Sequence, residues 1–404
     1  MSLMSYDAAL AILLKDLPVQ SIEEVGLLEA RTRVLAEPII APRSQPPEAL
    51  SAMDGYSVIA SDVAQVGARL DVVGEAPAGG RYNGTVKAGQ AVRIFTGAPV
   101  PTGADAVIIQ ENVSRDGDVI IVSDPLSATR NVRLAGIDFA KGDVLLSAGD
   151  QLTAERLALA AAANVSKLTV ARKPKVAVFS SGNELVEPGG VLQPGTIVNS
   201  GSYAVAALAE TWGTDVRVCP ILPDNVEGTI AAIEPYLETV DVMVTIGGAS
   251  VGKYDIVKPA FAKMGAQFQF EKAAIKPGKP IWHARFKNGP LIVGLPGNPA
   301  SAFVCGHLFL KPLLTSLVGI AYRPSNAKAR LVSNVPPNGP RETFLRARTD
   351  LINGVLNVAI DDRQDSLLLT PFNYSNVLIR RRPNAPPGKP GDMTDIITLH
   401  SLEP

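Results

Sequence analysis

Two lysines lie three residues apart in the short stretch IKPGKP, which spans residues 275–280. The prolines fix φ and stiffen the turn, while the glycine permits a positive φ. The Cα atoms of Lys276 and Lys279 are therefore at most about 10 Å apart. Such a pair could bind a small anion, although by itself the pattern favours a solvated turn that carries two lysines.

Glycine-rich turns and carboxylates follow the apolar runs in the middle of the chain. They occur in SSGNEL, LPDN, TIGGASVGKYD and GLPGNPAS, and the candidate residues are Ser181, Gly182, Glu184, Asp224, Gly247, Gly248, Ser250 and Asp255. In an open parallel sheet, ligands bind beyond the carboxyl ends of the strands, so these residues are expected at one edge. Exposed backbone N–H groups suit phosphate, and carboxylates suit Mg²⁺. The pattern predicts a site for a phosphorylated or nucleotidyl ligand.

Each of these motifs also has a purely structural interpretation. A Gly-Gly turn is often only a turn, Asp255 could cap a helix, and Glu184 could be a solvated carboxylate. The turns match neither GxGxxG nor GxxxxGK[ST], which weakens the dinucleotide and P-loop interpretations. Their convergence on one sheet edge is what favours a binding site.

Acidic, hydroxyl and arginine residues also occur in turns outside this region. Asp54 lies in SAMDGY, where it could form an Asx turn. Further candidates, in glycine turns and in the stretches RETFLRAR and RQDS, are Thr96, Asp138, Arg341, Arg346 and Ser366. The run RRR at residues 380–382 predicts a solvated strand edge.

Strands and helices are expected to alternate between about residues 171 and 322, where apolar runs and helical periodicity follow one another. This pattern predicts a central three-layer α/β domain with a mostly parallel sheet. Short Val and Ile runs broken by turns predict small β-rich domains on both sides. The expected divisions are an N-terminal helix packing on the α/β domain (1–20), a linker (21–48 and 135–170), a β-rich domain carrying SAMDGY (49–134), the α/β domain (171–322) and a C-terminal β-domain (323–404).

Composition limits the classes of function. The chain has 404 residues, 46% of them hydrophobic and 19% charged, so a multidomain protein with a sizeable core is expected. A formal net charge of −1 argues against nucleic acid or a membrane surface as a partner. No signal peptide is visible, and no apolar run reaches the ~20 residues of a membrane helix. Two cysteines without a CxxC pair indicate a reducing, cytoplasmic setting.

Seven stretches together resemble one family, the molybdopterin molybdenumtransferases, to which the C-terminal domain of gephyrin also belongs. They are SAMDGY, TGAPVPTGADAVI, SSGNEL, GGASVGKYD, AIKPGKP, GLPGNPAS and FLRAR. Their order and spacing are more specific than any single motif, because related pterin-binding domains share a similar α/β core. The SAMDGY region and the C-terminal β-domain distinguish this family from those relatives.

The resemblance implies an activity and an assembly. Adenylylated molybdopterin and molybdate would react to give the molybdenum cofactor and AMP, with Mg²⁺ required. Members of the family are homodimers, so the linker would be a dimerisation region and the active cleft would lie between subunits. The molybdopterin adenylyltransferase and other proteins of cofactor synthesis are the protein partners that this implies.

The resemblance also implies roles for individual residues. The catalytic residues would be Asp54, Asp138, Glu184, Asp255 and Lys276. The substrate-binding residues would be Thr96, Ser181, Gly182, Gly247, Gly248, Ser250, Lys272, Lys279, Pro280, Arg341, Arg346 and Ser366. The metal ligands would be Glu184, Asp224 and Asp255. Asp54, Thr96 and Asp138 would reach the cleft from the partner chain.

Two departures from the family pattern and two other functions bear on this interpretation. The stretch PDN lacks a second acid beside Asp224, and Asn199 stands where an aspartate is common.

One alternative function is that of a pterin-binding scaffold that has lost catalysis, which the retained acids disfavour. The other is an adenylyltransferase acting one step earlier, which would not need the SAMDGY domain.

Overall fold

The chain folds as two compact units. The computed structural model describes residues 3–126, 130–248, 256–323 and 327–399. The larger unit comprises Met1–Glu23, Thr32–Val34 and Val170–Pro404, and the smaller unit comprises Glu24–Arg31 and Leu35–Thr169. The five divisions expected from the sequence are finer than these two units and stay predictions.

A mixed sheet forms the centre of the larger unit, with strand order β16-β13-β17-β21-β20-β18. Its strands are β13 (Lys175–Ser180), β16 (Asp215–Val218), β17 (Val242–Ile246), β18 (Gln267–Phe270), β20 (Trp282–Arg285) and β21 (Leu291–Leu295). The first four in that order run parallel, and β20 is antiparallel to both of its neighbours. The predicted mostly parallel sheet is confirmed.

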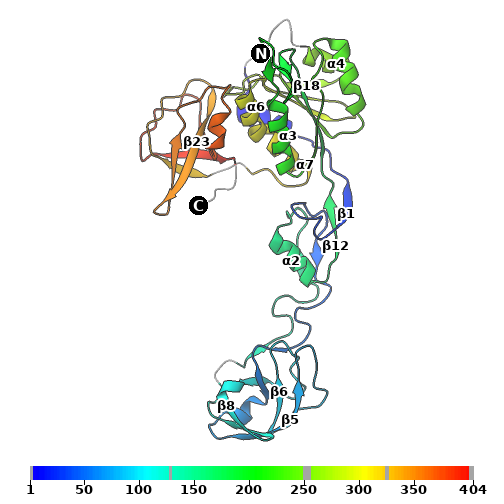
Figure 1. Cartoon of the computed structure of the whole chain (residues 1–404), viewed down its shortest axis with the longest axis vertical. Coiled ribbons are helices and arrows are strands. Elements are labelled where there is room, and N and C mark those ends of the chain that lie inside the picture. Colours follow the sequence, from blue (N-terminus) through cyan, green and yellow to red (C-terminus); the bar gives the residue numbers. More distant parts are fainter. Residues whose placement is uncertain (1–2, 127–129, 249–255, 324–326, 400–404) are drawn as a thin grey trace. The chain divides into compact units, whose positions relative to one another are not determined.

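Helices cover both faces of this sheet, as its apolar strands require. The helices are α1 (Tyr6–Leu13), α3 (Gly201–Thr211), α4 (Val226–Ile233), α5 (Val257–Lys263), α6 (Pro299–Cys305) and α7 (Lys311–Leu317), with the 3-10 helix η3 (Glu234–Tyr236) and the π-helix η4 (Gly306–Leu310). Val176 and Val178 of β13 share a core with α1, α3, α6 and α7, whereas Ala177 and Phe179 share one with α4 and α5. Figure 1 shows α3, α6 and α7 grouped together and α4 apart from them. The three-layer expectation is therefore confirmed.

Among the residues that the structure describes, one helical stretch has the length and composition of a membrane span. It runs over Pro299–Leu317, with a mean hydropathy of 1.3, and 78% of it is buried inside the protein. Its apolar side chains belong to the core cluster of the larger unit. Its composition therefore reflects a core helix.

The C-terminal strands close into a barrel. They are β22 (Lys328–Leu331), β23 (Glu342–Ile352), β24 (Val355–Ile360), β25 (Val377–Arg381) and β26 (Met393–Thr398), with β19 (Ile275–Lys276) added beside β23 and the 3-10 helix η5 (Thr370–Asn373) before β25. Closure follows because β25 pairs with β26 on one side and with β23 on the other. This is the predicted C-terminal β-domain.

The expected solvated strand edge at residues 380–382 is wrong for Arg380, whereas Arg382 lies beyond β25 and is exposed. Arg380 pairs with Phe344 on one side and with Asp395 on the other, so it does not lie on an edge. Its side chain is 10% exposed and forms ion pairs with Glu342 and Asp7. The physical reason is barrel closure, which gives β25 two neighbouring strands.

The smaller unit contains a β-rich sheet with strand order β7-β4-β6-β5-β9-β8. Its elements are β4 (Gly55–Val58), η1 (Ala60–Val63), β5 (Arg69–Ala76), β6 (Gln90–Ile94), β7 (Ala106–Ile109), η2 (Gln110–Asn112), β8 (Val113–Asp116) and β9 (Val119–Val122). Alternate side chains such as Tyr56, Val58, Ile108 and Ile120 build one core. The other elements are β2 (Ile39–Ile40) with β11 (Val144–Leu146), β3 (Leu50–Ser51) with β10 (Val132–Arg133), and α2 (Ala154–Ala162). The paired strands β1 (Ile22–Gly26) and β12 (Lys167–Ala171) each have residues in both units.

Candidate functional site

A cavity of about 530 Å³ lies at the carboxyl ends of β13, β17 and β21. From β13 the chain passes through α3 to β16 on one side, and from β16 it crosses to β17 on the other side of β13. Such a reversal of strand order leaves a crevice at the sheet edge, which is where open α/β sheets bind their ligands. The topology therefore explains why residues distant in the sequence line one cavity.

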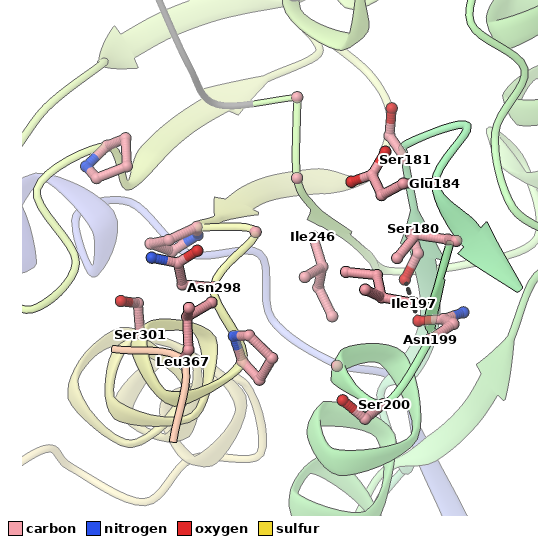
Figure 2. A pocket seen from close by; sticks show the side chains of 18 of the residues that line it. Ser180, Ser181, Glu184, Ile197, Asn199, Ser200, Ile246, Asn298, Ser301 and Leu367 are labelled. Atoms are coloured by element: carbon pink, nitrogen blue, oxygen red, sulfur yellow. Dashed lines mark hydrogen bonds between the residues drawn. The ribbon is translucent and has the colours of Figure 1, made fainter. Parts of the chain in front are cut away.

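The end of β13 supplies one wall of the cavity. Ser180, 1% exposed, donates a hydrogen bond through Oγ to Oδ1 of Asn199 at 2.9 Å. The predicted residues Ser181 and Glu184 line the cavity beside them (Figure 2). A short parallel ribbon of β14 (Leu185–Val186) and β15 (Ile197–Val198) continues this wall.

Gly182 leaves space that the Glu184 carboxylate occupies. Its φ is +146°, and a Cβ at this position would lie 2.5 Å from Oε2 of Glu184. Any larger residue would therefore strain the backbone and displace the carboxylate. Gly182 itself is not among the residues lining the cavity, and its role in substrate binding stays a prediction.

The turn after β17 brings two strand ends close together. Gly247 and Gly248 have φ values of +90° and +60°, and both line the cavity. A Cβ on Gly247 would lie 2.5 Å from the carbonyl oxygen of Ser181, so the close approach requires glycine. Ser250 and Asp255, which follow in the same motif, lie outside the described residues.

Lysines enter the cavity from the segment that contains IKPGKP. Lys272, Lys279 and Pro280 line it, whereas Lys276 is exposed on β19 and is not part of the lining. The N–H of Ala273 donates to the carbonyl of Lys279 at 3.0 Å, which brings the two ends of this segment together. The structure thus places Lys272 with Lys279 in one cavity, and the role of Lys276 stays a prediction.

A loop of the C-terminal barrel reaches the start of α6. Asn298 donates through Nδ2 to Oγ of Ser366 at 2.8 Å, and the N–H of Ala300 donates to the Ser366 carbonyl at 3.1 Å. The neighbouring Leu367 lines the cavity, on the opposite side from Ser180 and Asn199 (Figure 2). Ser366 therefore anchors the loop at the cavity rather than forming part of its lining.

The Arg346 side chain holds this loop through hydrogen bonds to the backbone of the loop. Its guanidinium donates to the carbonyl oxygens of Leu368, Arg363 and Asp365 at 2.8, 2.6 and 3.0 Å and lies over the Phe372 ring. The residue is 3% exposed, and burial lowers the pKa of its guanidinium. These contacts occupy Arg346 with the loop.

Arg341 lies apart from the cavity lining. It donates through Nη1 to the carbonyl of Ile275 at 3.2 Å, at the start of IKPGKP. The structure places neither Arg341 nor Arg346 in the lining, and substrate binding by either stays a prediction.

The predicted acids of the smaller unit differ in how they are held. Asp54 accepts hydrogen bonds from the N–H and the hydroxyl of Thr96, both at 2.8 Å. These bonds, with a smaller contribution from Arg93, lower the pKa of Asp54. Asp138 is exposed, and its N–H donates to the Gln45 carbonyl at 3.0 Å.

No group of three or more His, Cys, Asp or Glu residues suited to a metal ion occurs within the part of the chain that the structure describes. Mg²⁺ usually takes only one or two carboxylates together with phosphate oxygens of its ligand. Glu184, the carboxylate in the cavity lining, fits that requirement. Asp224 is exposed in the turn before α4 and does not line the cavity, so its metal role stays a prediction.

Sequence reasoning did not assign Asn298 or Leu367 to the site. GLPGNPAS predicts a turn at the expected binding edge without singling out Asn298, although an asparagine before a helix at a strand end is a signal that could have identified it. Leu367 gave no such signal, because an isolated leucine beside a serine has no distinctive chemistry.

Two family comparisons cover most of the chain. Residues 4–164 match the family described as MoeA N-terminal region (domain I and II). Residues 177–316 match the family described as probable molybdopterin binding domain. The second match contains most of the residues that line the cavity.

Individual relatives agree with these matches. The molybdopterin molybdenumtransferase of Haemophilus influenzae is 37% identical over 382 residues, covering 93% of this chain and 94% of that protein. The protein of the same name from a Nostoc species is 36% identical over 344 residues, covering 83% and 79%. A crystal structure of a molybdopterin biosynthesis moeA protein from Pyrococcus horikoshii has a TM-score of 0.85 at 29% identity, covering 98% of this chain and all of that one.

Proposed function

The chain belongs to the family of molybdopterin molybdenumtransferases, and from that premise we propose that it inserts molybdenum from molybdate into adenylylated molybdopterin, releasing AMP. The observation that carries the proposal is the cavity at the carboxyl ends of β13, β17 and β21. It combines two lysines, a carboxylate and a glycine turn, as a phosphorylated ligand requires.

The residues of the cavity suit the breaking of a phosphate ester or anhydride. Negative charge builds on phosphoryl oxygens as such a bond breaks, and fixed cations stabilise it most where water is excluded. Lys272 and Lys279 supply the cations. Lys276 is proposed to meet molybdate, because an exposed ammonium can bind a small dianion without a planar partner.

We propose Mg²⁺ as the metal, held by Glu184 and by Asp255, which lies outside the described residues. When bound, Mg²⁺ would neutralise charge on the phosphoryl oxygens. Glu184 is kept free for this role by the space that Gly182 leaves.

A homodimer in the cytoplasm is the proposed setting. Asp54, Thr96 and Asp138 would then act in the partner's cleft, with Asp54 held as a carboxylate by its bonds to Thr96. Both cysteines are buried and free, which suits a reducing compartment. The proposed protein partners are those that make and deliver the adenylylated pterin.

The test is an AMP-release assay on purified adenylylated molybdopterin with Mg²⁺, with and without molybdate. Molybdate-dependent AMP release, together with metal in the pterin product, is the expected result. AMP release that ignores molybdate, or no release at all, would contradict the proposed function. The Glu184→Gln variant should fold normally and release AMP more slowly, since it removes the carboxylate and keeps the shape.

A further inference from the structure

Asn199 joins the ribbon wall of the cavity to the central sheet. It is 2% exposed, lines the cavity and accepts a hydrogen bond from the Ser180 hydroxyl at 2.9 Å (Figure 2). Its backbone N–H donates to the Val186 carbonyl at 2.8 Å, which fixes β15 beside β14. One residue therefore connects the strand end to the ribbon, two positions before α3 begins.

The other end of the Asn199 amide faces a carboxylate. Its Nδ2 donates to Oε1 of Glu187 at 3.3 Å, and the Tyr203 hydroxyl donates to Oε2 of the same group at 3.0 Å. The bond to Glu187 raises the pKa of the Tyr203 hydroxyl. Glu187 thus accepts from both neighbours, as an ionised carboxylate does.

An aspartate at this position would change the charge of the wall and little else. It has nearly the same shape and could still accept from Ser180, but it could not donate to Glu187. Two carboxylates would then lie about 3.3 Å apart, and like charges at that distance repel. The added negative charge would also act on any anion bound beside Lys272 and Lys279.

We propose that Asn199 is a positioning and specificity-determining residue for the phosphorylated end of the substrate. Its neutral amide holds Ser180 and the β14–β15 ribbon through Glu187 without adding negative charge to the cavity. The inference rests on the proposed function, because it assumes that this cavity binds a phosphorylated ligand. Part of the cavity's affinity for anions would then depend on Asn199, although this residue bears no charge.

A charge-exchange series in the full-length chain tests this inference. The variants are N199D, E187Q and the double variant N199D/E187Q, in which amide and carboxylate change places and the net charge of the wild type is kept. Binding of AMP and of adenosine is measured by calorimetry at low and at high salt, and AMP release is measured in parallel. Thermal unfolding checks that each variant is folded.

We expect N199D to bind AMP about tenfold more weakly than the wild type at low salt, because one added charge acts through a partly buried site. Adenosine binding should be unchanged, and salt should reduce the difference. In AMP release, KM should rise about tenfold with kcat within threefold. The double variant should return AMP affinity to within about threefold of the wild type.

Several outcomes would overturn the inference. Unchanged AMP affinity in N199D would do so, as would an equal loss for AMP and adenosine or a failure of N199D/E187Q to restore binding. If the wild type releases AMP in a molybdate-dependent way but the variants give any of these outcomes, the inference about Asn199 is overturned and the proposed function stands. A wild type that neither binds nor releases AMP would overturn the proposed function and this inference with it.

Discussion

The cavity of the larger unit and the Asp54 turn of the smaller unit hold their acids in different ways. Glu184 lies in a cavity built from strand ends, a lysine segment and a barrel loop that are far apart in the sequence. Asp54 is exposed, and its carboxylate accepts hydrogen bonds from Thr96, just after the adjacent strand β6. The first region combines shape with charge, whereas the second presents one oriented carboxylate. We therefore expect substitutions to have larger effects in the first region.

The largest effect is expected for a cation of the cavity. Lys272→Ala should lower kcat/KM for AMP release about 100-fold, because it removes a fixed charge beside the developing negative charge. Steady-state kinetics with adenylylated molybdopterin measures this. Lys287→Ala, which removes an exposed lysine outside the cavity lining, is the matched control and should stay within twofold. Equal losses in both variants would contradict a cavity-specific role.

A smaller effect is expected from the glycine that leaves room for Glu184. Gly182→Ala should lower kcat about tenfold, because its Cβ would displace the carboxylate. Gly195→Ala is the control, since its φ is +89° but no atom lies within 4 Å of the added Cβ. Both variants should lose about 1 kcal/mol of unfolding free energy through backbone strain.

The rate of AMP release is expected to distinguish these two glycine variants. If Gly195→Ala slows AMP release as much as Gly182→Ala does, backbone strain accounts for the loss and the Glu184 argument fails. Circular dichroism melts run on both variants show whether their stabilities match.

The smallest effect is expected in the smaller unit. Thr96→Val removes the hydroxyl donor to Asp54 and keeps the backbone N–H, so the pKa of Asp54 should rise part of the way toward its usual value. A lowered carboxyl pKa stabilises the fold above the unfolded-state pKa, and this stability is lost as the pH falls through the folded-state pKa. The difference in unfolding free energy between neutral and acidic pH should therefore be smaller for the variant than for the wild type.

Carbon-13 NMR of labelled aspartate gives the titration curve of Asp54 directly. Thr102→Val, at an exposed threonine in the same unit, should leave that curve unchanged. A curve for Thr96→Val that overlays the wild type would show that the hydroxyl does not contribute.

The two regions also differ in how far the sequence predicted them. The α/β unit could be predicted because strands buried on both faces, such as β13, appear as short continuous apolar runs between helical patterns. The position of Glu184 at a strand end followed from the same pattern. The grouping of Lys272 with Lys279 did not, because it depends on the bond between Ala273 and Lys279.

The C-terminal barrel shows what residue type alone misses. Arg380 has the composition of a solvated edge, yet strand closure surrounds it with Glu342, Asp7 and paired backbone. The Arg346 guanidinium donates to the carbonyl groups of the loop at residues 363–368, which residue type did not predict, and its role in substrate binding stays a prediction. In both cases the partner of the arginine comes from a segment that no local pattern specifies.

The sequence by itself determined the alternation of strands and helices, the family, and the candidate residues at the strand ends. It did so because hydrophobic periodicity and turn residues act over a few positions along the chain. Only the tertiary structure decided that Leu367 and Asn199 lie on opposite sides of one cavity, and that Asn199 joins Ser180 to Glu187. Those neighbours depend on strand order and loop docking, which arise from burial across the whole unit.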